Sequence, residues 1–378
     1  MADVDTRRLL GGRTSAAFMH RYWHKDALLV PRAVPDFPPF ISRDQLMALA
    51  ARDNVSSRLV QRVRGRYTLH EGPLRIAELR RLPARNWTLL VQGVNLHSDA
   101  ADALLRRFAF VPFARLDDLM VSYAAPGGGV GPHADSYDVF LLQALGRRRW
   151  RYGRQDDLRL QPGVPLKILA RFTPQHEATL VRGDMLYLPP DFAHEGIAID
   201  ACITCSIGFR APLSQELAEA FLDHLRDAID MPGRYADPDL RPARAAAHID
   251  AKMRRRVART IAQIRWNPED TARFLGRYLT EPKPEVVFQP GRRATRERFL
   301  RQVVGQGVRL DRRTQLLYDD ARYYLNGEDA PLPATDRAEL RRLADRRALT
   351  PKECAALSTQ TIDLLHDWHC HGFLADPA

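Results

Sequence analysis

The stretches GPHADSYDVFLLQALGRRRW (residues 131–150) and GDMLYLPPDFAHEG (residues 183–196) decide the fold of this chain. In both, short apolar runs lie between Gly, Pro and Asp residues, a pattern typical of β-strands joined by turns. Similar runs continue from about residue 87 to about residue 210, among them WTLLVQGV, DDLMVSYAA and CITCSIGF. Helical patterns do not alternate with these runs, so a doubly wound parallel sheet is not expected. The sequence predicts an all-β sandwich or barrel over this region.

The pattern changes from strand to helix after Pro212. Leu213, Leu217, Phe221 and Leu225 recur every four residues and form one apolar stripe, which predicts a helix that ends before residues 232–233, Pro-Gly. We expect two more helices, a basic one around residues 248–264 and another from about residue 268. The middle of the chain is therefore predicted to be helical.

A Pro-rich stretch, EPKPEVVFQPGRR at residues 281–293, indicates a linker to a third unit. Beyond it, a helix near residues 336–347, a Thr-Pro cap at residues 350–351 and a hairpin-like LNGED at residues 325–329 favour a small winged-helix module. The predicted domains are a catalytic domain at residues 1–211, a helical dimerisation region at 212–281 and a winged-helix-like domain at 282–378.

Composition sets broad limits on function. The 378 residues carry a formal net charge of +11, with 45% hydrophobic and 27% charged residues, which excludes disordered and collagen-like chains. Four cysteines do not suggest a disulfide-stapled secreted scaffold. No apolar signal segment or membrane span is evident, so we expect a cytoplasmic protein.

The motif His133-Ala134-Asp135 is the strongest chemical signal. On a strand, residues i and i+2 project from the same face, so an imidazole and a carboxylate can reach one ion together. His194, which follows a second apolar strand, is the candidate third ligand. Two histidines and one carboxylate are typical of non-haem Fe(II) oxygenases, although zinc or manganese can use the same ligands. The alternative is an ordinary surface or core pair.

Arg148 narrows the choice of reaction. In the predicted strand RRRWRY, residues 147–152, Arg148 shares its face with Trp150 and Tyr152, and this aromatic face is expected to point inward. A buried guanidinium is costly unless it meets an anion, and its fork matches a carboxylate. The far carboxylate of 2-oxoglutarate would be such a partner. A structural ion pair with Asp138 is the alternative.

At this point the chain resembles a known family. Residues 87–210 resemble the JmjC-type double-stranded β-helix, a cupin-like jelly roll, and the two stretches quoted above resemble those of the bacterial ribosomal oxygenases. The resemblance extends over the whole chain: a jelly roll, a helical dimerisation region and a winged-helix module. It therefore implies a fold that is mainly β with added α-helices, and a homodimer.

The resemblance also implies roles for individual residues. His133, Asp135 and His194 would bind Fe(II), and Arg148 would meet 2-oxoglutarate, a co-substrate together with dioxygen. Ser122 stands where the family offers a hydroxyl to the co-substrate, although it is nearly as well explained as a core serine. The implied reaction is hydroxylation, at the β-carbon, of an arginine in the sixteenth large-subunit ribosomal protein.

Two other functions stay open from the residues alone. One is a ribosome-assembly or transcription factor with a vestigial jelly roll, whose winged helix binds nucleic acid. Residues 292–313 contain eight arginines and two acids, which favours a solvated or RNA-adjacent surface over sequence-specific readout of DNA. The other is an N-demethylating JmjC oxygenase. For an arginine substrate, Tyr137, Asp117 and Asp118 are candidate pocket walls.

Overall fold

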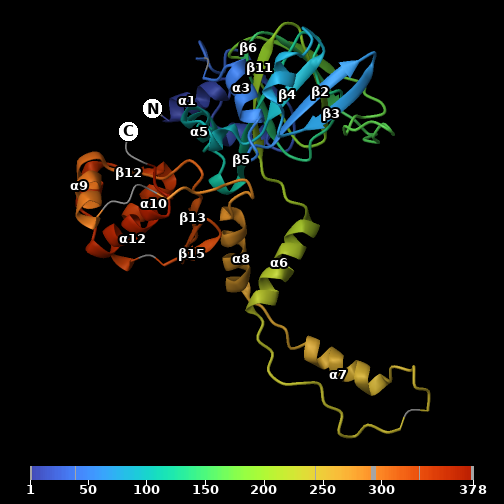
Figure 1. The fold of residues 1–378 in the computed structure, drawn as a ribbon, viewed down its shortest axis with the longest axis vertical. Coiled ribbons are helices and arrows are strands. Elements are labelled where there is room, and N and C mark those ends of the chain that lie inside the picture. Colours follow the sequence, from blue (N-terminus) through green and yellow to red (C-terminus); the bar gives the residue numbers. More distant parts are fainter. Residues whose placement is uncertain (1, 39, 243, 291–294, 332, 376–378) are drawn as a thin grey trace.

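The computed structural model describes residues 2–38, 40–242, 244–290, 295–331 and 333–375. A β-rich body, a helical arm and a small C-terminal module follow one another along the chain (Figure 1). Among these residues no helix has the length and apolar character that a membrane crossing requires.

Two antiparallel sheets form the body, as the alternating apolar runs predict. Val139 and Leu141 of the larger sheet pack against Trp150 and Phe192 of the smaller one, so the two sheets enclose a common core. In spatial order the larger sheet contains β1 (Leu28–Val30), β9 (Met185–Leu188), β6 (Val139–Leu145), β11 (Cys202–Phe209), β5 (Leu116–Ala124), β4 (Trp87–Val91), β2 (Ser57–Val63) and β3 (Arg66–Glu71). The smaller sheet contains β10 (Phe192–Ala198), β7 (Arg148–Arg154) and β8 (His176–Leu180).

Short helices complete the body and build a second core. The fully buried ring of Phe18 lies 5.6 Å from that of Phe140 and 4.9 Å from that of Tyr187, centroid to centroid. Such aromatic contacts anchor the N-terminal helices to β6 and β9. The helices are α1 (Ala2–Leu9), α2 (Ser15–Arg21), α3 (Arg43–Ala50), α4 (Ile76–Arg80) and α5 (Asp99–Arg106), with 3-10 turns η1 (Val94–Leu96) and η2 (Phe113–Arg115).

The helical arm leaves the body after β11. It consists of α6 (Ser214–Ala228), α7 (Ala251–Ile261) and α8 (Pro268–Thr280), which agrees with the predicted helices. Phe221 of α6 and Phe274 of α8 pack with ring centroids 5.2 Å apart. Helix α7 lies at the far end of the arm, away from the body (Figure 1), and contains no buried residue.

The C-terminal module has the helix and hairpin content of a winged helix. Its core gathers Phe299, Leu340, Leu365 and Trp368, and the predicted LNGED turn joins two strands through Asn326, whose φ is +50°. Left-handed backbone at such a turn suits Asn-Gly. The elements are α9 (Arg296–Gln306), β12 (Val308–Arg309), β13 (Leu316–Tyr318), β14 (Tyr323–Leu325), β15 (Glu328–Ala330), η3 (Ala334–Asp336), α10 (Arg337–Arg346), β16 (Ala348–Leu349), α11 (Pro351–Ala355) and α12 (Thr359–Cys370).

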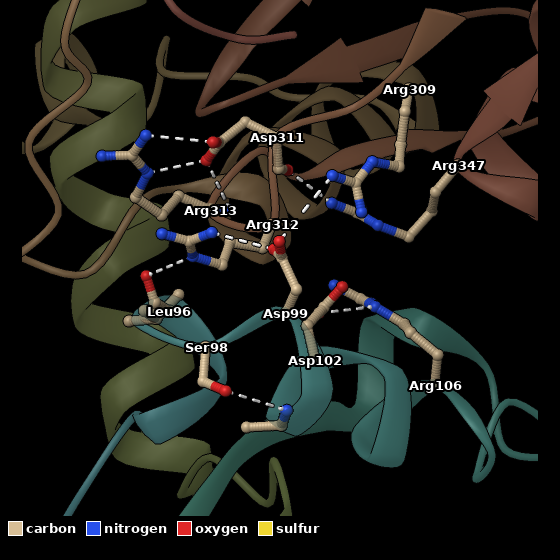
Figure 2. Close-up of polar contacts among 11 residues, drawn as sticks. Leu96, Ser98, Asp99, Asp102, Arg106, Arg309, Asp311, Arg312, Arg313 and Arg347 are labelled. Atoms are coloured by element: carbon tan, nitrogen blue, oxygen red, sulfur yellow. Dashed lines mark hydrogen bonds and ion pairs between the residues drawn. The ribbon is translucent and has the colours of Figure 1, made fainter. Parts of the chain in front are cut away.

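Charged side chains join this module to the body (Figure 2). Arg312 donates to the Asp99 carboxylate of α5 at 2.8 Å and to the backbone oxygen of Leu96 at 2.9 Å. Arg309 lies 3.9 Å from the same carboxylate. Exposed ion pairs contribute little stability each, about 0–1 kcal/mol. These contacts therefore orient the module against the body and add little to the free energy of folding.

The predicted order of a jelly roll, a helical region and a winged-helix-like module is confirmed. The antiparallel pairing also agrees with the rejection of a doubly wound parallel sheet.

Candidate metal centre

A short backbone pairing brings the two candidate histidines together. His133 lies in the loop before β6, and His194 lies in β10. The His133 N–H donates to the His194 oxygen at 3.0 Å, and the His194 N–H donates to the His133 oxygen at 2.8 Å. Their ring centroids are 4.3 Å apart. This isolated bridge extends the smaller sheet by one pair of residues and fixes the separation of the two rings.

Asp135 completes a compact group of three donors. The ligand atoms of His133, Asp135 and His194 all lie within 4.8 Å of one another, and Asp135 Oδ2 is 3.7 Å from His194 Nε2. Nδ1 of His133 lies 3.0 Å from the oxygen of Gly131, and Nδ1 of His194 lies 3.0 Å from that of Phe192. These contacts orient the rings so that both Nε2 atoms are left for a metal ion, as in many metal sites.

The electrostatics of the site favour a neutral imidazole. Burial, and next the neighbouring His133, lower the pKa of His194 to about 4. A metal ligand must be unprotonated, so little free energy is lost to proton release when an ion binds near pH 7. Two neutral nitrogens and one carboxylate form the donor set that non-haem Fe(II) uses while keeping positions open for other ligands. The residues present therefore fit such an ion.

One prediction about this motif is wrong. We expected His133 and Asp135 to share one face of a formed strand, but only His133 is paired, through a single bridge, and Asp135 lies outside any strand. The backbone oxygen of Asp135 instead accepts a hydrogen bond from the Asp191 N–H at 3.0 Å. The two ligands therefore converge because the loop is held against β10, and not because of strand alternation.

Arg148 points inward from β7, as predicted, and is 4% exposed. Among the described residues no carboxylate lies within 4.0 Å of its guanidinium. The alternative of an ion pair with Asp138 is wrong, because that buried carboxylate accepts a hydrogen bond from the Tyr187 hydroxyl and lies 3.2 Å from His24 Nε2. The guanidinium is thus a buried cation without a protein counter-charge.

Neutral groups hold this guanidinium in place. Nη1 donates to Ser122 Oγ at 3.2 Å and to Thr204 Oγ1 at 3.3 Å, while Nη2 donates to the Gly196 oxygen at 3.3 Å. The buried Nε atom has no hydrogen-bond partner among the described residues. Burial lowers the pKa of Arg148. Ser122 is therefore next to the guanidinium, whereas no sequence pattern had pointed to Thr204.

Trp150 is a further site residue that sequence reasoning left unassigned. The Cζ atom of Arg148 lies over the Trp150 ring, 5.0 Å from the ring centroid. The same centroid is 5.8 Å from the centroid of the His194 ring. The buried indole Nε1 has no hydrogen-bond partner among the described residues. A Cβ atom on Gly196 would lie 2.7 Å from Arg148 Nε and from the Trp150 ring, so this position requires glycine. The shared face of β7 was the available signal for Trp150.

The three candidate pocket walls separate into two groups. Asp117 lies 2.9 Å from Lys283 Nζ and 3.8 Å from Arg210 Nε, so it joins the body to the linker. Asp118 and Tyr137 instead flank Gly208, where a Cβ atom would lie 3.5 Å from Asp118 Oδ1 and 3.9 Å from the Tyr137 ring. Burial raises the pKa of Asp118 and of Tyr137, and the neighbouring Asp135 raises that of Tyr137 further.

Comparison with known proteins gives matches over nearly the whole chain. The JmjC domain model matches residues 103–217, and the ROXA-like winged helix model matches residues 263–375. The ribosomal protein uL16 3-hydroxylase of Escherichia coli (strain K12) is 34% identical over 340 residues, which are 88% of this chain and 89% of that protein. The probable ribosomal oxygenase of Haemophilus influenzae is 34% identical over 60% of this chain and 55% of its own length.

Solved structures agree with these matches. The X-ray structure of E. coli ycfD covers 95% of this chain and 97% of that one, at 31% identity and a TM-score of 0.83. The structure of YcfD, a ribosomal oxygenase from E. coli, in complex with cobalt and 2-oxoglutarate gives the same coverage at 30% identity and a TM-score of 0.78. The chain therefore belongs to the JmjC ribosomal oxygenases and is a 2-oxoglutarate-dependent oxygenase.

Proposed function

We propose that the protein uses Fe(II), 2-oxoglutarate and dioxygen to hydroxylate the β-carbon of an arginine side chain in ribosomal protein uL16. The observation that carries this proposal is the pairing of a three-donor metal group with a buried, uncompensated guanidinium on the neighbouring strand β7. The uL16 3-hydroxylase relative supports the substrate and the position of the new hydroxyl.

Each residue has a defined task in this proposal. His133, Asp135 and His194 hold Fe(II), which together with 2-oxoglutarate supplies the oxidising chemistry when bound. Arg148 neutralises the far carboxylate of the keto acid, and the Ser122 hydroxyl donates a hydrogen bond to the same carboxylate. Trp150 shields this ion pair from water, and in the absence of bulk water each polar contact is stronger.

The substrate arginine is proposed to enter between Asp118 and Tyr137. A carboxylate accepts hydrogen bonds from a guanidinium, and an aromatic face stabilises the same cation. Because Asp117 already pairs with Lys283, it is the weaker candidate for this role. The pocket is thus locally acidic within a chain of net charge +11.

A homodimer through the helical arm is also proposed. Met253, Val257 and Ile261 of α7 recur every four residues and are 42%, 40% and 60% exposed, and Leu222 of α6 is 64% exposed. Apolar stripes of this kind usually lie against a partner. Helix α6 carries four acids and one arginine, and α7 carries five basic residues and no acid, so α7 of one copy would complement α6 of another.

The boundaries near residues 211 and 281 stay a proposal, with residues 1–211 catalytic, 212–281 dimerising and 282–378 winged-helix-like. The cytoplasm, where a bacterial ribosome is assembled, is the proposed location.

The proposed reaction is tested with purified protein, Fe(II), 2-oxoglutarate and uL16. We expect uL16 to gain one oxygen atom at an arginine by tandem mass spectrometry, and succinate to form. His133→Ala and Asp135→Ala should abolish the product and Co(II) binding while circular dichroism stays unchanged, because both residues lie in a partly exposed loop. His20→Ala, which removes an exposed histidine, is the matched control. Formaldehyde with loss of a methyl group would indicate demethylation, and unmodified uL16 would favour the nucleic-acid-binding alternative.

Arg148→Ala should mainly weaken 2-oxoglutarate binding. Loss of one partner of a buried charge pair costs about 3–5 kcal/mol, which corresponds to a KM for 2-oxoglutarate raised by about a hundredfold or more. Arg149→Ala, on the opposite face of the same strand, should leave this KM unchanged. An unchanged KM in Arg148→Ala would remove Arg148 from the co-substrate site.

Asp118→Asn should lower kcat/KM for uL16 by about tenfold or more, because a charge-assisted hydrogen bond contributes about 1.5–3 kcal/mol. Turnover of 2-oxoglutarate without uL16 should persist, since Asp118 is not proposed to touch the co-substrate. The control is Asp117→Asn, for which kcat/KM should change little. Equal losses in both variants would contradict the assignment of the pocket.

The dimer is tested by light scattering during gel filtration. We expect the mass of two copies for the wild type, and the mass of one for the double variant Val257→Asp, Ile261→Asp, because two carboxylates would be buried in an apolar seam. Val4→Asp changes a residue of α1 that is 65% exposed and serves as the control. A monomeric wild type at micromolar concentration would contradict the proposal.

A further inference from the structure

Exposed arginines gather on the β2–β3 hairpin and on the segment that follows it. Residues 62–85 contain seven arginines and only two glutamates. All seven arginines are exposed. We call the following six the hairpin arginine surface: Arg62, Arg64, Arg66, Arg80, Arg81 and Arg85. In Figure 1 the hairpin lies on the side of the body that faces away from the C-terminal module.

In the part of the chain that the structure describes, these six arginines have no counter-charge within ion-pair distance. The seventh, Arg75, lies 3.6 Å from the Glu78 carboxylate, but among the described residues no carboxylate lies within 4.0 Å of any of the six. Several arginines elsewhere are paired, as in the contacts of Arg107 with Asp5 and of Arg147 with Asp200. Clustered, unpaired cations repel one another, and a polyanion relieves this repulsion.

The C-terminal module shows the opposite arrangement. Three arginines of the basic stretch at residues 292–313 form close ion pairs. The pairs are Arg296 with Asp363, Arg312 with Asp99, and Arg313 with Asp311. The arginines at 292 and 293 lie outside the described residues. Of the six arginines of this stretch that the structure describes, four therefore contact a carboxylate, and only Arg298 and Arg301 have no ion pair among the described residues.

Three of the six arginines line a surface hollow of about 430 Å³. The hollow is lined by residues 61–64 and 83–86, and none of these lining residues is acidic. Arg62 lies 5.7 Å from the centre of the Tyr67 ring, which limits the motion of its guanidinium. Guanidinium forks bind phosphate oxygens in pairs, so the hollow suits a phosphate group and its neighbours along a chain.

The hollow adjoins the metal loop. The Asn86 N–H, at the rim of the hollow, donates to the Pro126 oxygen at 2.9 Å. A Cβ atom on Gly131 would lie 3.4 Å from the Tyr67 hydroxyl, and the Gly131 oxygen contacts Nδ1 of His133. A polyanion on the hairpin would therefore lie near the loop that carries His133.

We propose that the hairpin arginine surface binds the phosphate backbone of RNA, without sequence preference, so that uL16 is presented to the enzyme together with RNA. This proposal rests on the proposed function, because it takes the substrate to be a ribosomal protein. Such proteins bind RNA through their own basic surfaces. A basic surface beside the active site repels the protein and attracts the RNA that accompanies it.

The test is fluorescence anisotropy with a short, labelled single-stranded RNA of mixed sequence, at several salt concentrations and without metal or 2-oxoglutarate. The triple variant Arg62→Gln, Arg64→Asn, Arg85→Gln removes the lining charges, and Asn suits the φ of +50° at position 64. We expect RNA affinity at about 0.1 M salt to fall tenfold or more, and the slope of log K against log salt to decrease by about two, since each phosphate contact contributes about 0.7.

Two further variants make the result specific. Arg298→Gln, Arg301→Gln, Arg337→Gln removes the same charge from exposed positions of the C-terminal module and should leave the affinity unchanged. The triple variant Arg62→Lys, Arg64→Lys, Arg85→Lys keeps the charge and should retain most of the binding. Equal losses in the two glutamine-containing triple variants would overturn the proposal, as would binding of phosphatidylglycerol vesicles or duplex DNA in preference to RNA.

The outcome is separable from that of the proposed function. All three variants leave the metal group and Arg148 untouched, so hydroxylation of free uL16 should equal that of the wild type. Hydroxylation without RNA binding would refute this inference alone. RNA binding by a protein that fails to hydroxylate uL16 would refute the proposed function while the surface stands.

Discussion

The reciprocal backbone hydrogen bonds between His133 and His194 are the interaction on which the site depends. They join a loop before β6 to a strand of the other sheet, so two imidazoles from distant parts of the chain face one another. The Nδ1 contacts to backbone oxygens then set the direction of each ring. Because the fold fixes these positions before any ion binds, little conformational entropy is lost when the metal is held.

The second feature of the site is a set of buried polar groups whose burial costs free energy of folding. Arg148 is buried among neutral acceptors, and its Nε atom and the indole nitrogen of Trp150 lack partners among the described residues. Unpaired buried polar atoms each cost about 1–3 kcal/mol. Proteins tolerate such a cost at binding sites, where a ligand supplies the missing partner. A carboxylate bound beside Arg148 would gain affinity because it removes a cost that the free protein carries.

The distribution of charge over the chain indicates which regions meet which partners, and the net charge alone does not. The total of +11 combines parts of different charge, among them an acidic α6, a basic α7, a largely paired C-terminal module and the hairpin arginine surface. In our proposals α6 and α7 meet the same helices of another copy, the C-terminal module meets the body, and the hairpin arginine surface meets RNA. The proposed binding of a cationic side chain at Asp118 is compatible with this net charge, because charges beyond about 10 Å are screened by salt.

Short-range patterns in the sequence determined the strands, the helices, the inward direction of Arg148 and the residue types of the metal group, because alternation and turn chemistry act between neighbours. Only the tertiary structure decided that Asp135 lies outside any strand. It also decided that the Asp138 carboxylate contacts Tyr187 and His24. The hydrogen bond from the Arg148 guanidinium to Thr204 is a third feature of this kind. The tertiary structure also decided which arginines stay unpaired. Pairings of this kind join residues far apart in the chain, and no local pattern encodes the distance between them.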